Sequence, residues 1–292
     1  MMATGQRLFV KVTRDSLPQI KDKYPFLYLE RGRLEIDDSS VKWIDSEGQV
    51  IRLPVATVNT LLLGPGTTVT HDAIKTLVAA NCNVCWVGED SLLFYAAGFL
   101  PTADTRNLKF QIQQAADPSI AIEVARRMFA RRFPDADLEG KNLKEMMGME
   151  GYRVRALYQH CAEKYQVGWR GRSFKPNKFE LSDITNKVLT ASNAALYGIL
   201  CSAVHSLGYS PQIGFIHSGS PLPFVYDLAD LYKEHLCVDL AFSLTRELAG
   251  RYDKHMVSTA FRRRVQEMDL LAQVALDIPE MLGVRHARRR RK

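Results

Sequence analysis

The sequence predicts an α+β protein in which a β-rich, sandwich-like N-terminal domain precedes a larger all-helical domain. Short segments of alternating hydrophobicity, separated by Gly, Pro, Asp and Ser, occupy residues 26–98. Beyond that region such segments nearly vanish, and apolar residues recur at helical spacing instead. The predicted organisation is a β-rich domain at 1–98, a linker at 99–103, a helical domain at 104–284 and a basic tail at 285–292.

Five segments of the β-rich domain read as strands, which we expect to pair as an antiparallel assembly. They are residues 26–36, 40–54, 57–63, 83–88 and 92–98. Ser46, Glu47 and Gly48 predict a hairpin turn inside the second segment. One helix interrupts the strands at 71–81, where Thr70 is a suitable N-cap for apolar residues at helical spacing.

Seven segments of the second domain carry helical periodicity, and some contain breaks that the periodicity does not locate. They are residues 108–116, 119–133, 138–147, 150–165, 184–207, 224–248 and 254–276. Gly98 and Pro101 separate these segments from the strands and mark the linker. Helices therefore account for most of the second domain.

The five cysteines, at positions 82, 85, 161, 201 and 237, are too few and too scattered for a disulfide framework in a chain of 292 residues. Cys82 and Cys85 form a C-x-x-C, but the surrounding NCNVCWVG reads as a buried strand, and no second pair completes a zinc tetrahedron. Packing is therefore favoured over metal or redox chemistry at this pair.

From the hydrophobic pattern we expect a cytoplasmic protein without membrane association. A composition of 46% hydrophobic and 24% charged residues is ordinary for a globular chain. No continuous apolar run reaches the length of a membrane span, about 18 residues. The start, MMATGQRLFVKV, lacks the apolar core and cleavage site of a signal peptide.

The C-terminal tail supplies six of the formal net charge of +7, through Arg285, Lys292 and the four arginines at 288–291. A terminal run of this kind is typical of a disordered arm that binds polyanions such as nucleic acid. A solvated arm without a binding role explains the same composition, so both interpretations stay open.

One imidazole lies in strongly apolar sequence within residues 213–234. Ile213, Phe215 and His217 alternate like one face of an extended segment, so His217 is expected to point where two apolar side chains point. The structural alternative is a hydrogen-bonded core histidine without a chemical role.

Two carboxylates follow on a helix expected to begin near Pro221 and Pro223. Asp227 and Asp230 are three residues apart, so they project one turn from each other beside the apolar stripe. Two anions that close to a core need a compensating cation. The alternative is that the helix dipole alone favours aspartates near the N-terminus.

A third acid, Glu150, lies four residues before Val154 on the stripe that continues through Leu157 and Cys161. A carboxylate on that stripe is costly unless it is paired or bound to a metal, and an ion pair with Arg153 is the structural alternative. With His217 and the two aspartates it forms an oxygen-rich set with one imidazole. Such a set suits Mg²⁺ or Mn²⁺.

These motifs are similar to those of a known family. GMEGYRVRALY, followed about sixty residues later by GFIHSGSPLPFVYDLADLYK, resembles the CRISPR adaptation integrases, the larger subunits of the complexes that insert spacers into a CRISPR array. PGTTVTHDAI, CWVGED, RRMFARRF, GWRGRSFKP and LYGIL support the resemblance in the family's order, closest to the subtype I-E branch. The resemblance implies an N-terminal β-sandwich and a C-terminal helical domain.

The resemblance also implies the site and the chemistry. Glu150, His217 and Asp230 would bind the divalent metal, and Asp227 would belong to the same catalytic cluster. The reaction would be a transesterification, in which the 3′-hydroxyl of a spacer precursor attacks a phosphodiester at the edge of a repeat. The implied partners are spacer and repeat DNA, a second copy of the chain, and a small CRISPR adaptation subunit in a heterohexamer, with the β-rich domain serving dimerisation and contact with the DNA ends.

Seven residues are candidates for contacting the DNA, through phosphates or by stacking. They are Arg31, Arg153, Arg155, Arg172, Phe174, Tyr197 and Tyr226. Arg31 stands before Gly32, where relatives carry an aromatic wedge between the duplex ends, so guanidinium stacking would have to replace ring stacking. Core packing and solvated faces are the structural alternatives for these residues.

Two other functions use the same features. A free-standing metal-dependent endonuclease on branched DNA would have the same site, with water as the nucleophile. A non-catalytic DNA-binding scaffold would have the acidic residues as a buried network and the basic tail as its binding arm.

Overall fold

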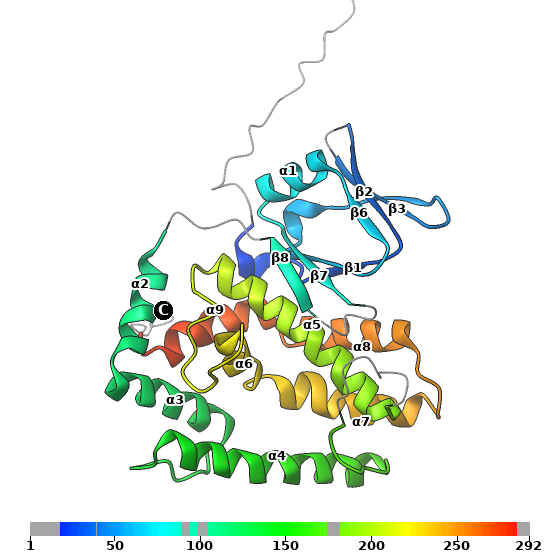
Figure 1. Ribbon diagram of the computed structural model, residues 1–292. Coiled ribbons are helices and arrows are strands. Elements are labelled where there is room, and N and C mark those ends of the chain that lie inside the picture. Colours follow the sequence, from blue (N-terminus) through cyan, green and yellow to red (C-terminus); the bar gives the residue numbers. More distant parts are fainter. Residues whose placement is uncertain (1–17, 39, 89–93, 99–103, 174–181, 285–292) are drawn as a thin grey trace, which may run out of the picture.

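The computed structural model describes residues 18–38, 40–88, 94–98, 104–173 and 182–284. The predicted linker, the basic tail and Phe174 lie outside these residues. Within them, the sheets come first in the chain and helices make up nearly all that follows (Figure 1). The predicted α+β class is confirmed.

The described strands form two four-stranded sheets. One sheet has the order β1 (Leu27–Leu29), β5 (Thr60–Leu63), β7 (Asn83–Val87) and β8 (Phe94–Gly98). The other has the order β4 (Val50–Arg52), β3 (Ser40–Asp45), β2 (Gly32–Asp37) and β6 (Thr67–Val69). Two short 3-10 helices, at Ile20–Asp22 and Val55–Thr57, accompany them.

The prediction of an antiparallel assembly is wrong, because both sheets contain parallel pairs. β1 pairs with β5, β5 with β7, and β2 with β6 in parallel. Helix α1 (His71–Ala79) explains one of them, since it carries the chain across between β6 and β7 and lets β7 run in the direction of β5. Alternating hydrophobicity marks a strand but says nothing about its direction.

The hairpin turn and the helix N-cap predicted for this region are confirmed. β3 and β4 form the expected hairpin, and Gly48 takes the left-handed conformation at φ +81° that a side chain would disfavour. The Asp45 carboxylate accepts hydrogen bonds from the backbone N–H groups of Glu47 and Gln49 and closes the turn. The hydroxyl of Thr70 accepts from the N–H of Ala73, as an N-cap should.

The helical region contains one long central helix surrounded by shorter ones. The helices are α2 (Arg106–Ala116), α3 (Pro118–Arg132), α4 (Leu143–Tyr165), α5 (Ile184–Ser206), α6 (Pro223–Ala229), α7 (Asp239–Glu247), α8 (Lys254–Glu267) and α9 (Leu270–Met281), with a π-helical turn at Glu234–Val238. In Figure 1, α5 runs beneath the sheets and α4 lies along the edge farthest from them.

Four of the expected helical segments are merged or divided in the structure. Segments 138–147 and 150–165 are one helix, α4, which starts later because Gly140 takes φ +67° and Asn142 forms a capping box with Glu145. Segment 224–248 divides into α6, the π turn and α7. Segment 254–276 is interrupted at Asp269, which takes φ +50°. Periodicity persists across such breaks, so it does not reveal them.

Strand β5 contributes to two hydrophobic cores at once. Leu61 and Leu63 belong to the core between the two sheets and α1, whereas Leu62 points to the opposite face and joins the core of the helical region. The period of two along a strand produces this division. Cys82 and Cys85 divide in the same way, one to each core, and both are free thiols, so their expected packing role is confirmed.

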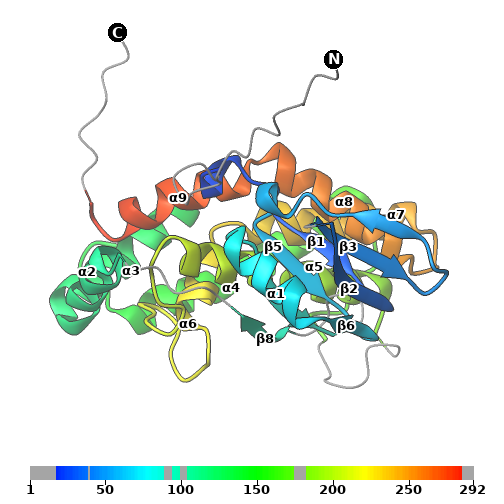
Figure 2. The ribbon, with the colours of Figure 1, turned by 90° about the horizontal axis from the view of Figure 1, so that it is seen from above.

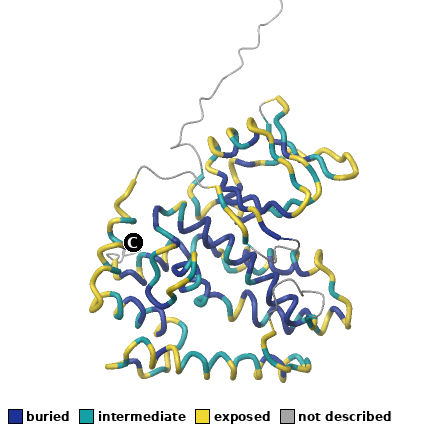
Figure 3. The backbone as a smooth tube through the Cα atoms, viewed as in Figure 1, coloured by how far each residue is buried: buried dark blue, intermediate teal, exposed yellow. Residues whose placement is uncertain are grey.

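Helix α5 carries most of the helical core and also holds the sheet. Figure 3 shows it buried along its length beneath the strands. Within the described ranges it is the one helix long and apolar enough to cross a membrane, but 83% of that stretch is buried inside the protein, which makes it a core helix. Its Ser202 hydroxyl lies 2.7 Å from the hydroxyl of Thr60 and accepts hydrogen bonds from the amides of Asn59 and Asn83.

Candidate active site

Asp227 organises the loop that carries His217. Its carboxylate is fully buried and accepts hydrogen bonds from the backbone N–H groups of Phe215, Ile216 and His217 at 2.6, 3.2 and 2.9 Å. The expected extended segment is therefore wrong here, because successive N–H groups of a strand point to opposite sides. The loop instead wraps three of them around one anion.

Gly214 explains how the loop comes this close to α6. A Cβ at that position would lie 2.7 Å from Cβ of Pro223 and 3.0 Å from the Asp227 carboxylate. No side chain fits without moving α6 away, so the glycine permits the contact.

His217 is oriented by the same carboxylate. Its Nδ1 lies 2.8 Å from Oδ1 of Asp227, and an ionised carboxylate accepts only, so Nδ1 carries the proton and donates. This hydrogen bond raises the pKa of His217 above its ordinary value against the opposing effect of burial, and the charge of Asp230 adds to the rise. Nε2 is left facing Asp230, 3.8 Å from its Oδ2.

Glu150 and Asp230 meet at a common cation. Nη1 of Arg132 lies 2.6 Å from Oε1 of Glu150 and 3.7 Å from Oδ2 of Asp230. Glu150 comes from α4, Arg132 from the end of α3, and Asp230 from the residue that follows α6. Three separate segments thus converge, and each of these side chains is less than one-fifth exposed.

A second cation, Lys233, lies 2.8 Å from the other oxygen of Asp230. Burial alone would lower the pKa of Lys233, but Asp230 and Tyr197 raise it above its ordinary value, so the amine stays charged. Its Nζ also lies 5.0 Å from the ring centre of Tyr197, a cation–π contact. Asp230 is therefore held between two cations.

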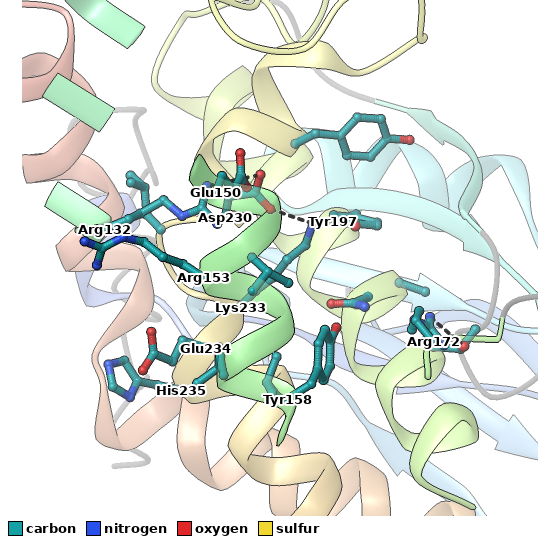
Figure 4. A pocket seen from close by; sticks show the side chains of 18 of the residues that line it. Arg132, Glu150, Arg153, Tyr158, Arg172, Tyr197, Asp230, Lys233, Glu234 and His235 are labelled. Carbon is teal, nitrogen blue, oxygen red and sulfur yellow. Dashed lines mark hydrogen bonds and ion pairs between the residues drawn. The ribbon is translucent and has the colours of Figure 1, made fainter. Parts of the chain in front are cut away.

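A pocket of about 800 Å³ between α3, α4 and α5 is lined by Arg132, Glu150, Asp230 and Lys233 among others, but not by His217 or Asp227. Figure 4 shows Arg132 with Glu150 and Asp230 on one side of the pocket and Arg172 on the other. Phe94 and Tyr95 of β8 complete the lining. A strand of the β-rich region thus borders the same pocket as the acidic cluster, which no local signal in the sequence indicates.

The structure places some of the DNA-contact candidates in the pocket and others outside it. Arg153, Arg172, Tyr197 and Tyr226 line the pocket, whereas Arg31 and Arg155 are exposed elsewhere, on the β1–β2 turn and on α4.

Two of the pocket arginines already have protein partners. Arg172 donates to the Asn186 side chain and to Thr190, and burial lowers the pKa of Arg172. Arg153 pairs with Asp135 through two hydrogen bonds of 2.9 Å, so the ion pair with Glu150 expected as an alternative is formed by Arg132 instead.

The donor chemistry fits a hard divalent cation. Two carboxylates and one imidazole are ligands that Mg²⁺ and Mn²⁺ accept, and a carboxylate on Nδ1 is the usual support of a metal-binding histidine. Among the described residues, no three His, Cys, Asp or Glu side chains already lie together as a metal site. Arg132 bridges Glu150 and Asp230 instead, so metal binding requires the guanidinium to move.

Two residues of this cluster were not assigned a role from the sequence. The spacing of Lys233 does indicate its role, because a lysine three residues after a helical aspartate is placed to pair with it. No local sequence pattern indicates the role of Arg132, because its partners are 18 and 98 positions away along the chain.

Comparison with known proteins identifies the family. The family model described as CRISPR associated protein Cas1 matches residues 128–258, which include all four residues of the predicted cluster. The CRISPR-associated endonuclease Cas1 2 of Chlorobaculum tepidum is 66% identical, over 95% of this chain and 94% of that protein. The chain belongs to the Cas1 family.

Other members of the Cas1 family are less similar in sequence but match over a comparable share of this chain. The CRISPR-associated endonuclease Cas1 of Escherichia coli strain K12 is 35% identical over 90% of this chain and 86% of its own length. A crystal structure of a TtCas1–DNA complex is 37% identical, with a TM-score of 0.67, and covers 91% of this chain and 99% of that one. The resemblance to CRISPR adaptation integrases is thereby confirmed.

Proposed function

We propose that this Cas1-family protein joins the 3′-hydroxyl of a spacer precursor to a phosphodiester at the edge of a CRISPR repeat, in a metal-dependent transesterification. The observation that carries the proposal is the meeting of Glu150 and Asp230 at the wall of a pocket lined by basic and aromatic residues, with Nε2 of His217 facing Asp230. The names of the relatives as endonucleases, and the DNA in one related structure, support it.

The reaction exchanges one phosphodiester for another. The 3′-oxygen of the spacer precursor forms a bond to phosphorus as the bond from phosphorus to the target's 3′-oxygen breaks. The proton of the attacking hydroxyl is lost, and the departing oxygen gains one. No covalent bond to the protein is required, so the mechanism needs no Ser or Cys nucleophile.

The protein's part is to hold charges at fixed places. Glu150, Asp230 and Nε2 of His217 are the groups that would hold the cation, and Asp227 fixes the imidazole with its proton on Nδ1. A bound Mg²⁺ or Mn²⁺ would lower the charge of the phosphoryl group and align the oxygens in line. Tyr197 and Tyr226 meet edge to face at 4.9 Å and offer a surface for bases near the reacting end.

The proposal includes the assembly and the location. The active form would be a homodimer that joins the small CRISPR adaptation subunit in a heterohexamer, acting on spacer precursors and the repeat array in the cytoplasm. The terminal arginines would add affinity for DNA without reading its sequence.

A spacer precursor ending in 2′,3′-dideoxynucleotides tests the reaction type. It keeps every phosphate contact but lacks the attacking oxygen, so it should bind normally and give no joined product. The assay needs the small partner, Mg²⁺ or Mn²⁺ and a supercoiled target that carries a repeat. Equal nicking by hydroxyl and dideoxy donors would instead establish the endonuclease alternative, and DNA binding without any nicking or joining would establish the scaffold.

A further inference from the structure

We propose that Arg132 is a placeholder cation, which holds Glu150 and Asp230 together before the metal binds and which the metal displaces. This inference rests on the proposed metal site. It starts from the guanidinium, whose Nη1 lies 2.6 Å from Glu150 and 3.7 Å from Asp230. The same two carboxylates are the ones that the divalent ion would need.

The two carboxylates need a cation even without a metal. Only 17% of the Glu150 side chain and 9% of the Asp230 side chain are exposed, so water screens their mutual repulsion poorly. Lys233 pairs with Oδ1 of Asp230 and leaves Oδ2 to Arg132. Within the described residues, Arg132 supplies the ion pair of Glu150. It therefore completes the charge balance of the cluster.

The guanidinium is itself held in place from the side. It lies 4.9 Å from the ring centre of Phe133, while the guanidinium of Arg153 lies 5.1 Å from the same ring. Arg153 is turned away from the cluster and forms its two hydrogen bonds with Asp135. The two arginines are thus alike in charge and in their ring contact, but only Arg132 touches the proposed ligands.

Competition follows from this placement. A carboxylate oxygen that accepts from Nη1 at 2.6 Å has no room for a metal ion at bonding distance in the same direction. Metal binding must first break the ion pair. The apparent dissociation constant for the metal therefore equals the intrinsic one divided by the fraction of molecules in which Arg132 has moved away. Removing the guanidinium removes this cost and restores the repulsion between the carboxylates, and both effects favour the metal.

The test is a titration of the full-length protein with Mn²⁺, in which the EPR signal reports the free ion. Arg132→Gln is expected to bind Mn²⁺ with a Kd about tenfold lower than that of the unchanged protein. Arg153→Gln is the matched control and should leave the Kd unchanged. An unchanged or higher Kd in Arg132→Gln would overturn the proposal, and so would an equal decrease in both variants, since the effect would then be one of net charge.

Thermal unfolding gives a second measurement that does not depend on EPR. In chelator, Arg132→Gln should unfold at a lower Tm than the unchanged protein, and saturating Mn²⁺ should remove most of the difference. A deficit that Mn²⁺ leaves unchanged would mean that Arg132 is only structural. If neither protein binds Mn²⁺, the metal site itself is absent and the placeholder has no function. Arg132→Lys, which keeps the charge on a smaller head group, should give an intermediate Kd.

Discussion

Asp227 and His217 are joined twice, because Oδ1 of Asp227 accepts from the backbone N–H of His217 at 2.9 Å and from its Nδ1 at 2.8 Å. The other oxygen accepts two further backbone hydrogen bonds from the same loop. The carboxylate therefore determines both the path of the loop and the direction of the ring. The contribution that these hydrogen bonds give Asp227 is to position the loop and the imidazole.

Asp227→Asn should consequently destabilise the protein as well as inactivate it. The new amide places an N–H donor against two donors of the loop, and we expect a loss of about 3 kcal/mol in the free energy of unfolding. Denaturant unfolding in chelator measures it. Asp135→Asn, which alters a surface ion pair, should leave the midpoint unchanged. Equal midpoints for both variants would mean that the buried hydrogen bonds contribute nothing.

Glu150→Gln should remove the reaction while keeping the fold. The amide preserves the shape of the side chain but is a poor ligand for a hard cation, so joined product should fall by at least about a hundredfold. Glu163→Gln, an exposed change on the same helix, is the control for integration assays with the small partner present. Substantial joining by Glu150→Gln would remove this glutamate from the site.

The pKa of His217 predicts how stability depends on pH without metal. Because the folded-state pKa is raised above that of the unfolded chain, the stabilising contribution is fully present below about pH 6.5 and is lost as the pH rises through the folded-state value. In chelator, the Tm difference between the unchanged protein and His217→Gln should be larger at pH 5.5 than at pH 8.5. The same difference at both pH values would contradict the assigned hydrogen bond.

Deletion of residues 285–292 should weaken DNA binding in a salt-dependent way. The deletion removes six cationic side chains. If each contacts a phosphate of a duplex, the slope of log K against log salt becomes shallower by up to about 5. Fluorescence anisotropy at several salt concentrations measures the slope on two unrelated duplexes, which should change alike. An unchanged slope would show that the tail does not contact DNA.

The sequence was sufficient for the α+β class, the N-cap of α1, the β3–β4 hairpin and the buried cysteines, because each depends on neighbours along the chain. The direction of β7 depends on a crossover, and the wrapped loop at residues 215–217 depends on an anion ten or more positions away. Arg132 lay inside the RRMFARRF motif, but its role follows only from where α3 ends in space. Local patterns thus predict elements, whereas contacts between distant segments decide the site.

The division of β5 between two cores makes the two halves of this protein inseparable. Leu62 and the hydroxyl of Ser202 join the first sheet to α5, and Figure 2 shows the sheets lying over that helix. A protease cut between residues 98 and 104 would leave two pieces that remain bound to each other. A gene fragment beginning at Asp104 would expose the sheet-binding side of α5, so we expect it to aggregate unless the strands are supplied with it.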